Sequence, residues 1–156
     1  MRRIDTCLDW IIRAEGGLSA DPNDRGGLTK YGISQTAYPD VDIEALTEAD
    51  ARLIYERDYW LHCRCADLPI GVDQVVLDGA VLMGVSAVSK QLQRALGVKV
   101  DGRIGPKTIM AAQKAGDDII PALMAERALY LAKAPTWKQH GRGWMLRTFQ
   151  LMKEVC

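Results

Sequence analysis

The chain has 156 residues, of which 48% are hydrophobic and 26% charged, a composition typical of a soluble globular domain. Its 20 Lys and Arg balance its 20 Asp and Glu, so no excess of positive charge indicates general nucleic-acid binding. No apolar run approaches the roughly 18 residues of a membrane span, and charged residues interrupt the start where a signal peptide would be apolar. We expect synthesis in the cytoplasm, without a signal peptide or a membrane anchor.

The charges are unevenly distributed along the chain. Residues 1–60 contain 12 Asp and Glu against 7 Lys and Arg, whereas residues 61–156 contain 8 against 13. A basic second half could meet an anionic polymer. A complementary dipole between two lobes would explain the same counts, and the sequence leaves both interpretations open.

The first predicted helix ends in a carboxyl group. Ile4, Leu8, Ile11 and Glu15 are spaced by four, three and four residues, which places them on one helical face before a glycine pair ends the helix. A carboxyl group at the end of an apolar stripe is poorly solvated and lies beside the partial negative charge of the helix end. Both effects favour the protonated form, so Glu15 is a candidate general acid.

A polar loop follows, with a second carboxylate. Residues 18–33 are rich in turn-forming residues, and "GGLTKYGIS" predicts a small β-hairpin. Asp24 in this loop should stay ionised, and a protonated Glu15 with an ionised Asp24 would suit glycoside hydrolysis. A frayed helix end and an ordinary turn aspartate would give the same spacing, so the spacing alone does not decide.

The rest of the chain is predicted to be helical. Thr47 and Asp50 form a capping-box pattern, so a helix should follow through about residue 61. Residues 72–84 are almost entirely apolar, as in a helix at the centre of a core. Further helices are expected after a Ser86 cap, after Pro106, after a capping aspartate at 117 or 118, and near Gly143–Glu154. The predicted fold class is α+β, predominantly helical.

One residue of the apolar helix 72–84 is charged. An unpaired charge in an apolar environment is costly, so Asp78 should have a partner such as an arginine or a helix N-terminus. The four cysteines lack the spacing of a zinc site, and we expect no metal site.

Several motifs resemble those of one family. "EGG" and the pattern D-x-GG-x-T-x-x-GI, which runs from Asp24 to Ile33, resemble the signature of glycoside hydrolase family 108. This family comprises bacterial and prophage N-acetylmuramidases, some of them described as secretion activators. Tyr59–Trp60, the stretch from Asp78 to Val81, and "LQRALGVKVDGRIGPKT" resemble later family segments, the last one its peptidoglycan-binding segment. The residues of that last segment would equally make a simple turn and a capped helix.

The resemblance implies an architecture and roles for individual residues. It implies a lysozyme-like fold in which residues 1–85 are the catalytic region and residues 86–156 a helical peptidoglycan-binding region, packed as one globule. Glu15 takes the position of the catalytic acid. A looser likeness to phage-type lysozymes implies that Asp24 and Thr29 position the attacking water.

Two aromatic residues and one departure from the family complete the site prediction. Tyr31 and Trp60 could offer flat faces to sugars, although aromatic residues at helical spacing are more often part of a core. Leu82 stands where the family usually has asparagine. If that asparagine binds the sugar or positions water, the change would weaken the activity, alter its specificity or abolish it.

The sequence therefore predicts a muramidase that cleaves the β-1,4 MurNAc–GlcNAc bond of peptidoglycan by acid-assisted attack of water, without a metal or organic cofactor. Carboxyl groups about 6.5–9.5 Å apart would indicate inversion, and about 5–5.5 Å retention. The expected partners are peptidoglycan glycan strands and a holin or a secretion system, with action in the periplasm or cell wall. The alternatives are a lytic transglycosylase and a non-catalytic cell-wall-binding or secretion-accessory protein.

Overall fold

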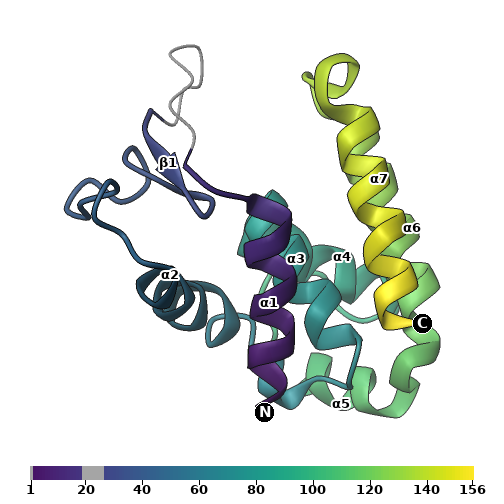
Figure 1. Cartoon of the computed structure of the whole chain (residues 1–156). Coiled ribbons are helices and arrows are strands. Elements are labelled where there is room, and N and C mark those ends of the chain that lie inside the picture. Colours follow the sequence, from purple (N-terminus) through teal and green to yellow (C-terminus); the bar gives the residue numbers. More distant parts are fainter. Residues whose placement is uncertain (1, 19–26) are drawn as a thin grey trace. The chain divides into compact units, whose positions relative to one another are not determined.

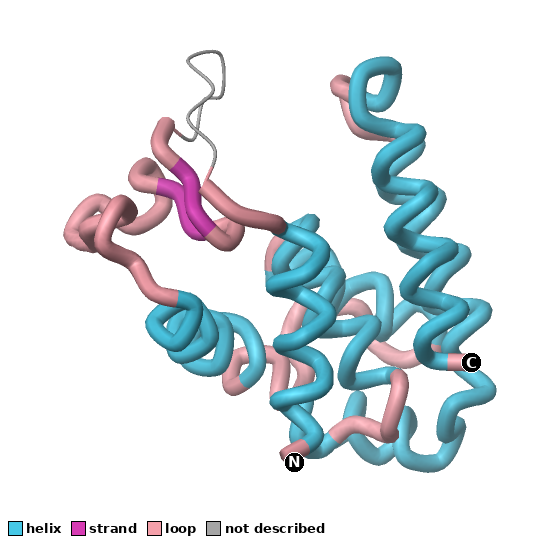
Figure 2. The backbone as a smooth tube through the Cα atoms, viewed as in Figure 1, coloured by secondary structure: helices cyan, strands magenta, loops and turns pink. Residues whose placement is uncertain are grey.

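The computed structural model describes residues 2–18 and 27–156 and divides into two compact units, Met1–Asp58 and Tyr59–Cys156. Helices dominate both units, and the two strands form one small antiparallel pair (Figures 1 and 2). The predicted fold class, α+β and predominantly helical with a small hairpin, is confirmed. Within the described ranges, no helix combines the length and the apolar character needed to cross a membrane.

The first unit begins with helix α1, Arg3–Glu15, whose apolar stripe lies where the sequence predicts it. Ile4, Leu8 and Ile11 are buried, and Glu15 is half-buried at the end of the same stripe. Gly16 ends the helix with a φ of 75°, and its N–H donates to the Ile12 carbonyl over 3.1 Å. Glycine suits this position because its backbone adopts positive φ at little cost.

The β-hairpin consists of β1, Thr29–Lys30, and β2, Ile33–Ser34, in antiparallel register. The two connecting residues, Tyr31 and Gly32, have φ values of 52° and 77°. Positive φ at both central residues is the mark of the tight hairpin turn that matches the twist of its strands. Tyrosine rarely adopts this conformation, so the surrounding contacts must hold it there.

Helix α2, Glu48–Tyr55, starts with the predicted capping box. The Asp50 N–H donates to the Thr47 hydroxyl over 3.2 Å, and the Thr47 N–H donates to the Asp50 carboxylate over 3.1 Å. Beyond Tyr55 the chain continues as the π-helix η1, Glu56–Trp60, so the predicted helix to about residue 61 changes its winding near its end.

A salt bridge connects α2 to α1. The Arg52 guanidinium lies 2.6 Å from the Asp9 carboxylate of α1 and 2.8 Å from Glu48 on its own helix. These side chains are partly exposed, so the bridge adds orientation more than stability.

The second unit is organised around α3, Val72–Met83. All nine residues from Val72 to Ala80 are buried, as expected for a central helix, and α3 contacts α4, α6 and α7. Gly79 lets α4 approach closely, because a Cβ atom in its place would lie 2.6 Å from Val88 Cγ2.

The second unit contains further helices. They are the short 3-10 turn η2, Cys65–Asp67, then α4, Val85–Ala95, α5, Pro106–Ala115, the 3-10 turn η3, Gly116–Ile119, α6, Ile120–Ala132, and α7, Trp137–Val155. Pro106 opens α5 as predicted, since proline suits the first helical position.

Three predicted helix starts were wrong. Gly84 and not Ser86 precedes α4, and Asp117 and Asp118 lie inside η3, which runs directly into α6 without a side-chain cap. The last helix begins at Trp137 and not at Gly143. Gly141 and Gly143 lower the helix propensity of this stretch, so the sequence pattern placed the start too late. Gly141 nevertheless lies inside the helix, where the Trp137 ring packs against it. An added Cβ would lie 2.6 Å from that ring.

Asp78 has arginine partners, as the sequence analysis expects. It is 0% exposed, and its carboxylate lies 2.6 Å from Arg127 Nη2 of α6 and 2.8 Å from Arg147 Nη2 of α7. Burial lowers the pKa of Arg127, while the charge of Asp78 acts in the opposite direction. Arg127 Nε also donates to the Thr148 hydroxyl over 3.0 Å. The buried carboxylate thus joins three helices through paired charges.

Candidate active site

Glu15 lies where α1 meets the turn of the β-hairpin. A Cβ atom placed on Gly32 would lie 2.7 Å from Glu15 Cγ and 2.9 Å from Glu15 Oε2. The hairpin backbone therefore lies directly against the carboxyl side chain, with no room for a larger residue at Gly32. Residues 15 and 32 are distant in sequence, so this contact fixes the carboxyl group by tertiary structure.

Tyr55 of α2 completes this arrangement. It is 1% exposed, and its hydroxyl oxygen lies so near Gly32 that an added Cβ would stand 2.5 Å away. The same hydroxyl donates to the Tyr31 carbonyl over 2.7 Å, which holds the turn in its left-handed conformation. Three elements thus meet at Glu15: the end of α1, the hairpin turn, and the end of α2.

The sequence pattern does not mark Tyr55 as a site residue. Its position in the sequence is that of an ordinary apolar-face residue of a helix. The available signal was chemical: a buried tyrosine hydroxyl requires a hydrogen-bond partner, and a glycine turn offers carbonyl groups.

Thr29 and Tyr31 both belong to the hairpin and are half-buried. The Thr29 hydroxyl donates to the Gly27 carbonyl over 3.3 Å, which leaves its oxygen able to accept a hydrogen bond from water. The Lys30 ammonium lies 5.8 Å from the centre of the Tyr31 ring, within the range of a cation–π contact. It also donates to the Glu44 carbonyl over 2.9 Å, which ties the hairpin to the following loop.

Two further residues, Asp24 and Trp60, belong to the site prediction. Asp24 lies outside the described residues. Trp60, the last residue of η1, is 5% exposed and belongs to the apolar core. A ring covered to this extent offers almost no face to a sugar, because the stacking surface is already in contact with protein. Trp60 is therefore better described as a core residue than as a residue that stacks on a sugar.

The structure also places the potential metal ligands and Leu82. In the described part of the chain, no three His, Cys, Asp or Glu side chains group so as to hold a metal ion. Cys7, Cys63 and Cys65 are buried thiols. Leu82 is half-buried on α3, one turn beyond Asp78.

Comparisons with known proteins agree with this architecture. Residues 8–84 match the family model described as glycosyl hydrolase 108, and residues 87–149 match the model described as "Predicted Peptidoglycan domain". The solved structure of Brucella abortus SagA is similar, with 34% sequence identity, a TM-score of 0.89, and coverage of 97% of this chain and 92% of that chain. No curated protein sequence matches the chain.

Proposed function

The chain belongs to the glycosyl hydrolase 108 family and is a glycoside hydrolase that acts on peptidoglycan; within that activity, we propose that it is a muramidase with Glu15 as its general acid. It would cleave the β-1,4 bond that follows N-acetylmuramic acid. The observation that supports this role best is the contact of the Glu15 side chain with the Gly32 turn.

This contact matters because a general acid must be positioned accurately. Glu15 ends a helix, is only half-buried, and lies against the Gly32 turn, which the hydroxyl of the buried Tyr55 also contacts. Tertiary structure thus positions its side chain, while the residue stays partly exposed to solvent. Proton transfer by a side chain held in this way contributes about 10²–10⁴-fold to the rate of an enzyme.

In the proposed reaction, Glu15 donates its proton to the glycosidic oxygen as the bond from that oxygen to the anomeric carbon breaks. A water molecule attacks the anomeric carbon and gives its proton to Asp24, and the Thr29 hydroxyl accepts a hydrogen bond from that water. Proton transfer from water to carboxylate balances the proton delivered to the leaving sugar. No cofactor takes part in these steps.

Tyr31 is the aromatic residue proposed to contact a sugar. Tyr31 is half-buried and precedes Gly32 in the hairpin turn that contacts Glu15. An aromatic face packs against the apolar face of a sugar ring, and the phenol hydroxyl can bond to its polar edge.

The test compares the wild-type chain with Glu15→Gln on isolated sacculi. Released reducing ends are counted, the products are reduced with borohydride, and the sugar alcohols are identified by mass spectrometry. We expect new reducing ends on muramic acid with the wild type and almost none with Glu15→Gln, because glutamine keeps the shape of the side chain but has no acidic proton to transfer.

Each other outcome contradicts a specific part of the proposal. Equal release by the two proteins would exclude Glu15 as the acid. Reducing ends on glucosamine would identify the other glycosidic bond, and products lighter by one water would identify a lytic transglycosylase. Binding to sacculi without any cleavage by the wild type would support a wall-binding role instead.

The route to the wall is part of the same proposal. We expect a holin or a secretion system of the host cell to carry the protein outward. Deleting the exporting system should keep the enzyme and its activity inside intact cells, whereas unchanged activity in the medium would contradict this route.

A further inference from the structure

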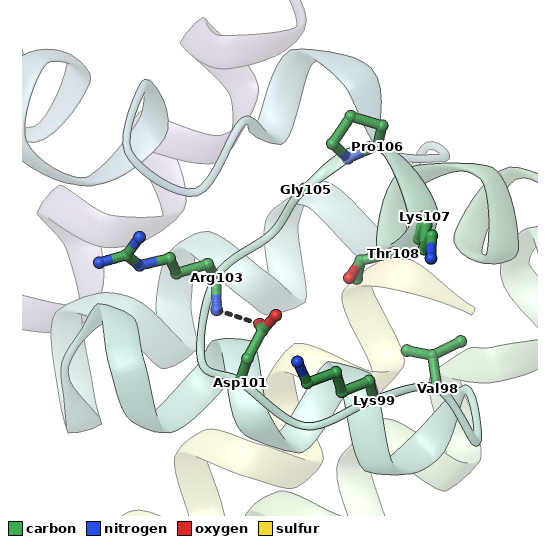
Figure 3. Close-up of a pocket in the computed structure, with 8 residues that line it drawn as sticks. All are labelled: Val98, Lys99, Asp101, Arg103, Gly105, Pro106, Lys107 and Thr108. Atoms are coloured by element: carbon green, nitrogen blue, oxygen red, sulfur yellow. Dashed lines mark hydrogen bonds between the residues drawn. The ribbon is translucent and has the colours of Figure 1, made fainter.

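The second unit contains an open cavity of about 510 Å³ (Figure 3). It is formed by the loop that joins α4 to α5 and by the first turn of α5, within residues 98–108. Binding pockets for small ligands typically have volumes of ~300–1,000 Å³, so the cavity is large enough for a short peptide.

A single buried side chain holds the cavity loop in shape. Gln93 of α4 is 1% exposed, and its Oε1 accepts hydrogen bonds from the N–H groups of Asp101, at 3.0 Å, and Gly102, at 2.9 Å. Its Nε2 donates to the Asp101 carboxylate at 2.8 Å and to the Arg103 carbonyl at 2.9 Å. Walls that are fixed before binding lose little conformational entropy when a ligand enters.

Charged groups of both signs line this fixed cavity. Lys99 lies on the loop and Lys107 on the first turn of α5, and neither forms an ion pair with any described residue (Figure 3). The Gln93 amide and the Arg103 N–H hold the pKa of Asp101 below its ordinary value, so this carboxylate is ionised at neutral pH. Arg103 also lines the cavity, so three cationic side chains and one carboxylate belong to its wall (Figure 3).

These groups fit one component of peptidoglycan better than the other. The sugars carry no charge where the lactyl group is joined to peptide, whereas the stem peptides carry free carboxylates and an amine on their diamino acid. No aromatic ring lines the cavity, so it lacks the flat face on which sugars stack. Its apolar walls, Val98 and Pro106, suit the short alkyl side chains of a peptide.

We propose that this cavity binds the carboxylate-bearing stem peptide of peptidoglycan. Lys99 and Lys107 hold carboxylates of the peptide, and Asp101 faces its amine. The inference rests on the proposed function in one respect: it takes the same polymer as the ligand. The match of residues 87–149 to a peptidoglycan domain covers the whole cavity.

The test measures binding to the full chain by calorimetry. The ligands are a synthetic stem tetrapeptide with free carboxylates and the same peptide with its carboxylates converted to amides. The variants are Lys99→Gln with Lys107→Gln, and a matched control, Lys114→Gln with Lys133→Gln, which removes two exposed charges outside the cavity.

We expect the cavity variant to bind the free tetrapeptide about tenfold more weakly or worse, since hydrogen bonds to charged groups are lost. The control should bind like the wild type, and the amidated peptide should bind as poorly as the cavity variant does. Equal binding by both double variants, equal binding of both peptides, or no binding by the wild type would overturn the proposal.

The experiment distinguishes a failure of the cavity proposal from a failure of the muramidase proposal. The release of reducing ends from sacculi is measured with the same wild-type preparation. Release without peptide binding contradicts the cavity proposal alone, and peptide binding without release contradicts the muramidase proposal alone. If the double glutamine variant is poorly folded by circular dichroism, Lys99→Arg with Lys107→Arg, which keeps both charges, must retain binding.

Discussion

Glu15 in the first unit and Asp78 in the second are both carboxyl groups on helices with an apolar face, yet their surroundings differ. Asp78 is fully buried in the middle of α3 and lies within 2.8 Å of two guanidinium groups. Glu15 is half-buried at the end of α1, against a hairpin turn and beside a tyrosine hydroxyl. Nearby cations hold a carboxylate in its ionised form, so Asp78 suits a structural role. A carboxyl group with access to solvent, held by backbone, suits proton transfer.

The first prediction separates the two roles by activity. Glu15→Gln should lower the rate of glycan cleavage by about 10²–10⁴-fold, because the proton donor is lost. Its free energy of unfolding in urea should stay close to that of the wild type. A large loss of stability would show that Glu15 is structural, like Asp78.

The second prediction concerns Asp78. Asp78→Asn leaves the buried Arg127 and the half-buried Arg147 without their carboxylate and should lower the free energy of unfolding by about 3–5 kcal/mol. Denaturant unfolding of the full chain measures this loss. Asp117→Asn, at an exposed position in η3, is the control and should change the stability little. Equal stability of the two variants would contradict a structural role for Asp78.

The third prediction tests whether the contact with Gly32 positions Glu15. Gly32→Ala places a methyl group against the Glu15 side chain and the Tyr55 hydroxyl, at a φ that costs other residues about 1–2 kcal/mol. A shift of the acid by about 1 Å should lower the rate up to ~10²-fold, measured as reducing ends released.

The matched control for the turn is Gly97→Ala. Gly97 has a φ of 65°, but no atom lies within 4 Å of an added Cβ. This variant should lose stability because of its positive φ, but it should cleave the glycan at the rate of the wild type. If both glycine variants lose activity alike, the contact between the turn and Glu15 is not what positions the acid.

The smallest predicted effect concerns the start of α2. Thr47→Ala removes the side-chain cap and should cost about 1 kcal/mol of stability. Hydrogen bonds from Thr47 hold the pKa of Asp50 below its ordinary value, and the variant should let that pKa rise. Because folding lowers this pKa, the contribution to stability is present above the ordinary value and is lost as the pH falls through the lowered one. NMR titration of the Asp50 carboxyl group in both proteins measures this change. An unchanged pKa in the variant would contradict the capping interaction.

Local patterns predicted much of the fold. The stripe that ends at Glu15, the Thr47 capping box and the hairpin each depend on residues within a few positions of one another, and all three are present. The need for a partner at Asp78 was also predictable, because burial of a charge follows from the apolar helix around it. Which arginines supply that partner was not, since α6 and α7 are distant in sequence.

The site itself was predictable only in part. Glu15 could be chosen from helical spacing, but its contacts with Gly32 and Tyr55 arise from tertiary packing of three elements. The burial of Trp60 was not predictable for the same reason: whether an aromatic ring at helical spacing is covered depends on neighbours that the local sequence does not show.

The left-handed backbone at Tyr31 implies a compromise between the stability of the hairpin and catalysis. Asparagine is better suited to a φ of 52° than tyrosine, so Tyr31→Asn should stabilise the hairpin while removing the aromatic ring from its tip. A chain selected for resistance to heat alone would be expected to drift toward such a residue. Retention of an unfavourable aromatic residue there would then report selection on what the hairpin touches, rather than on how firmly it folds.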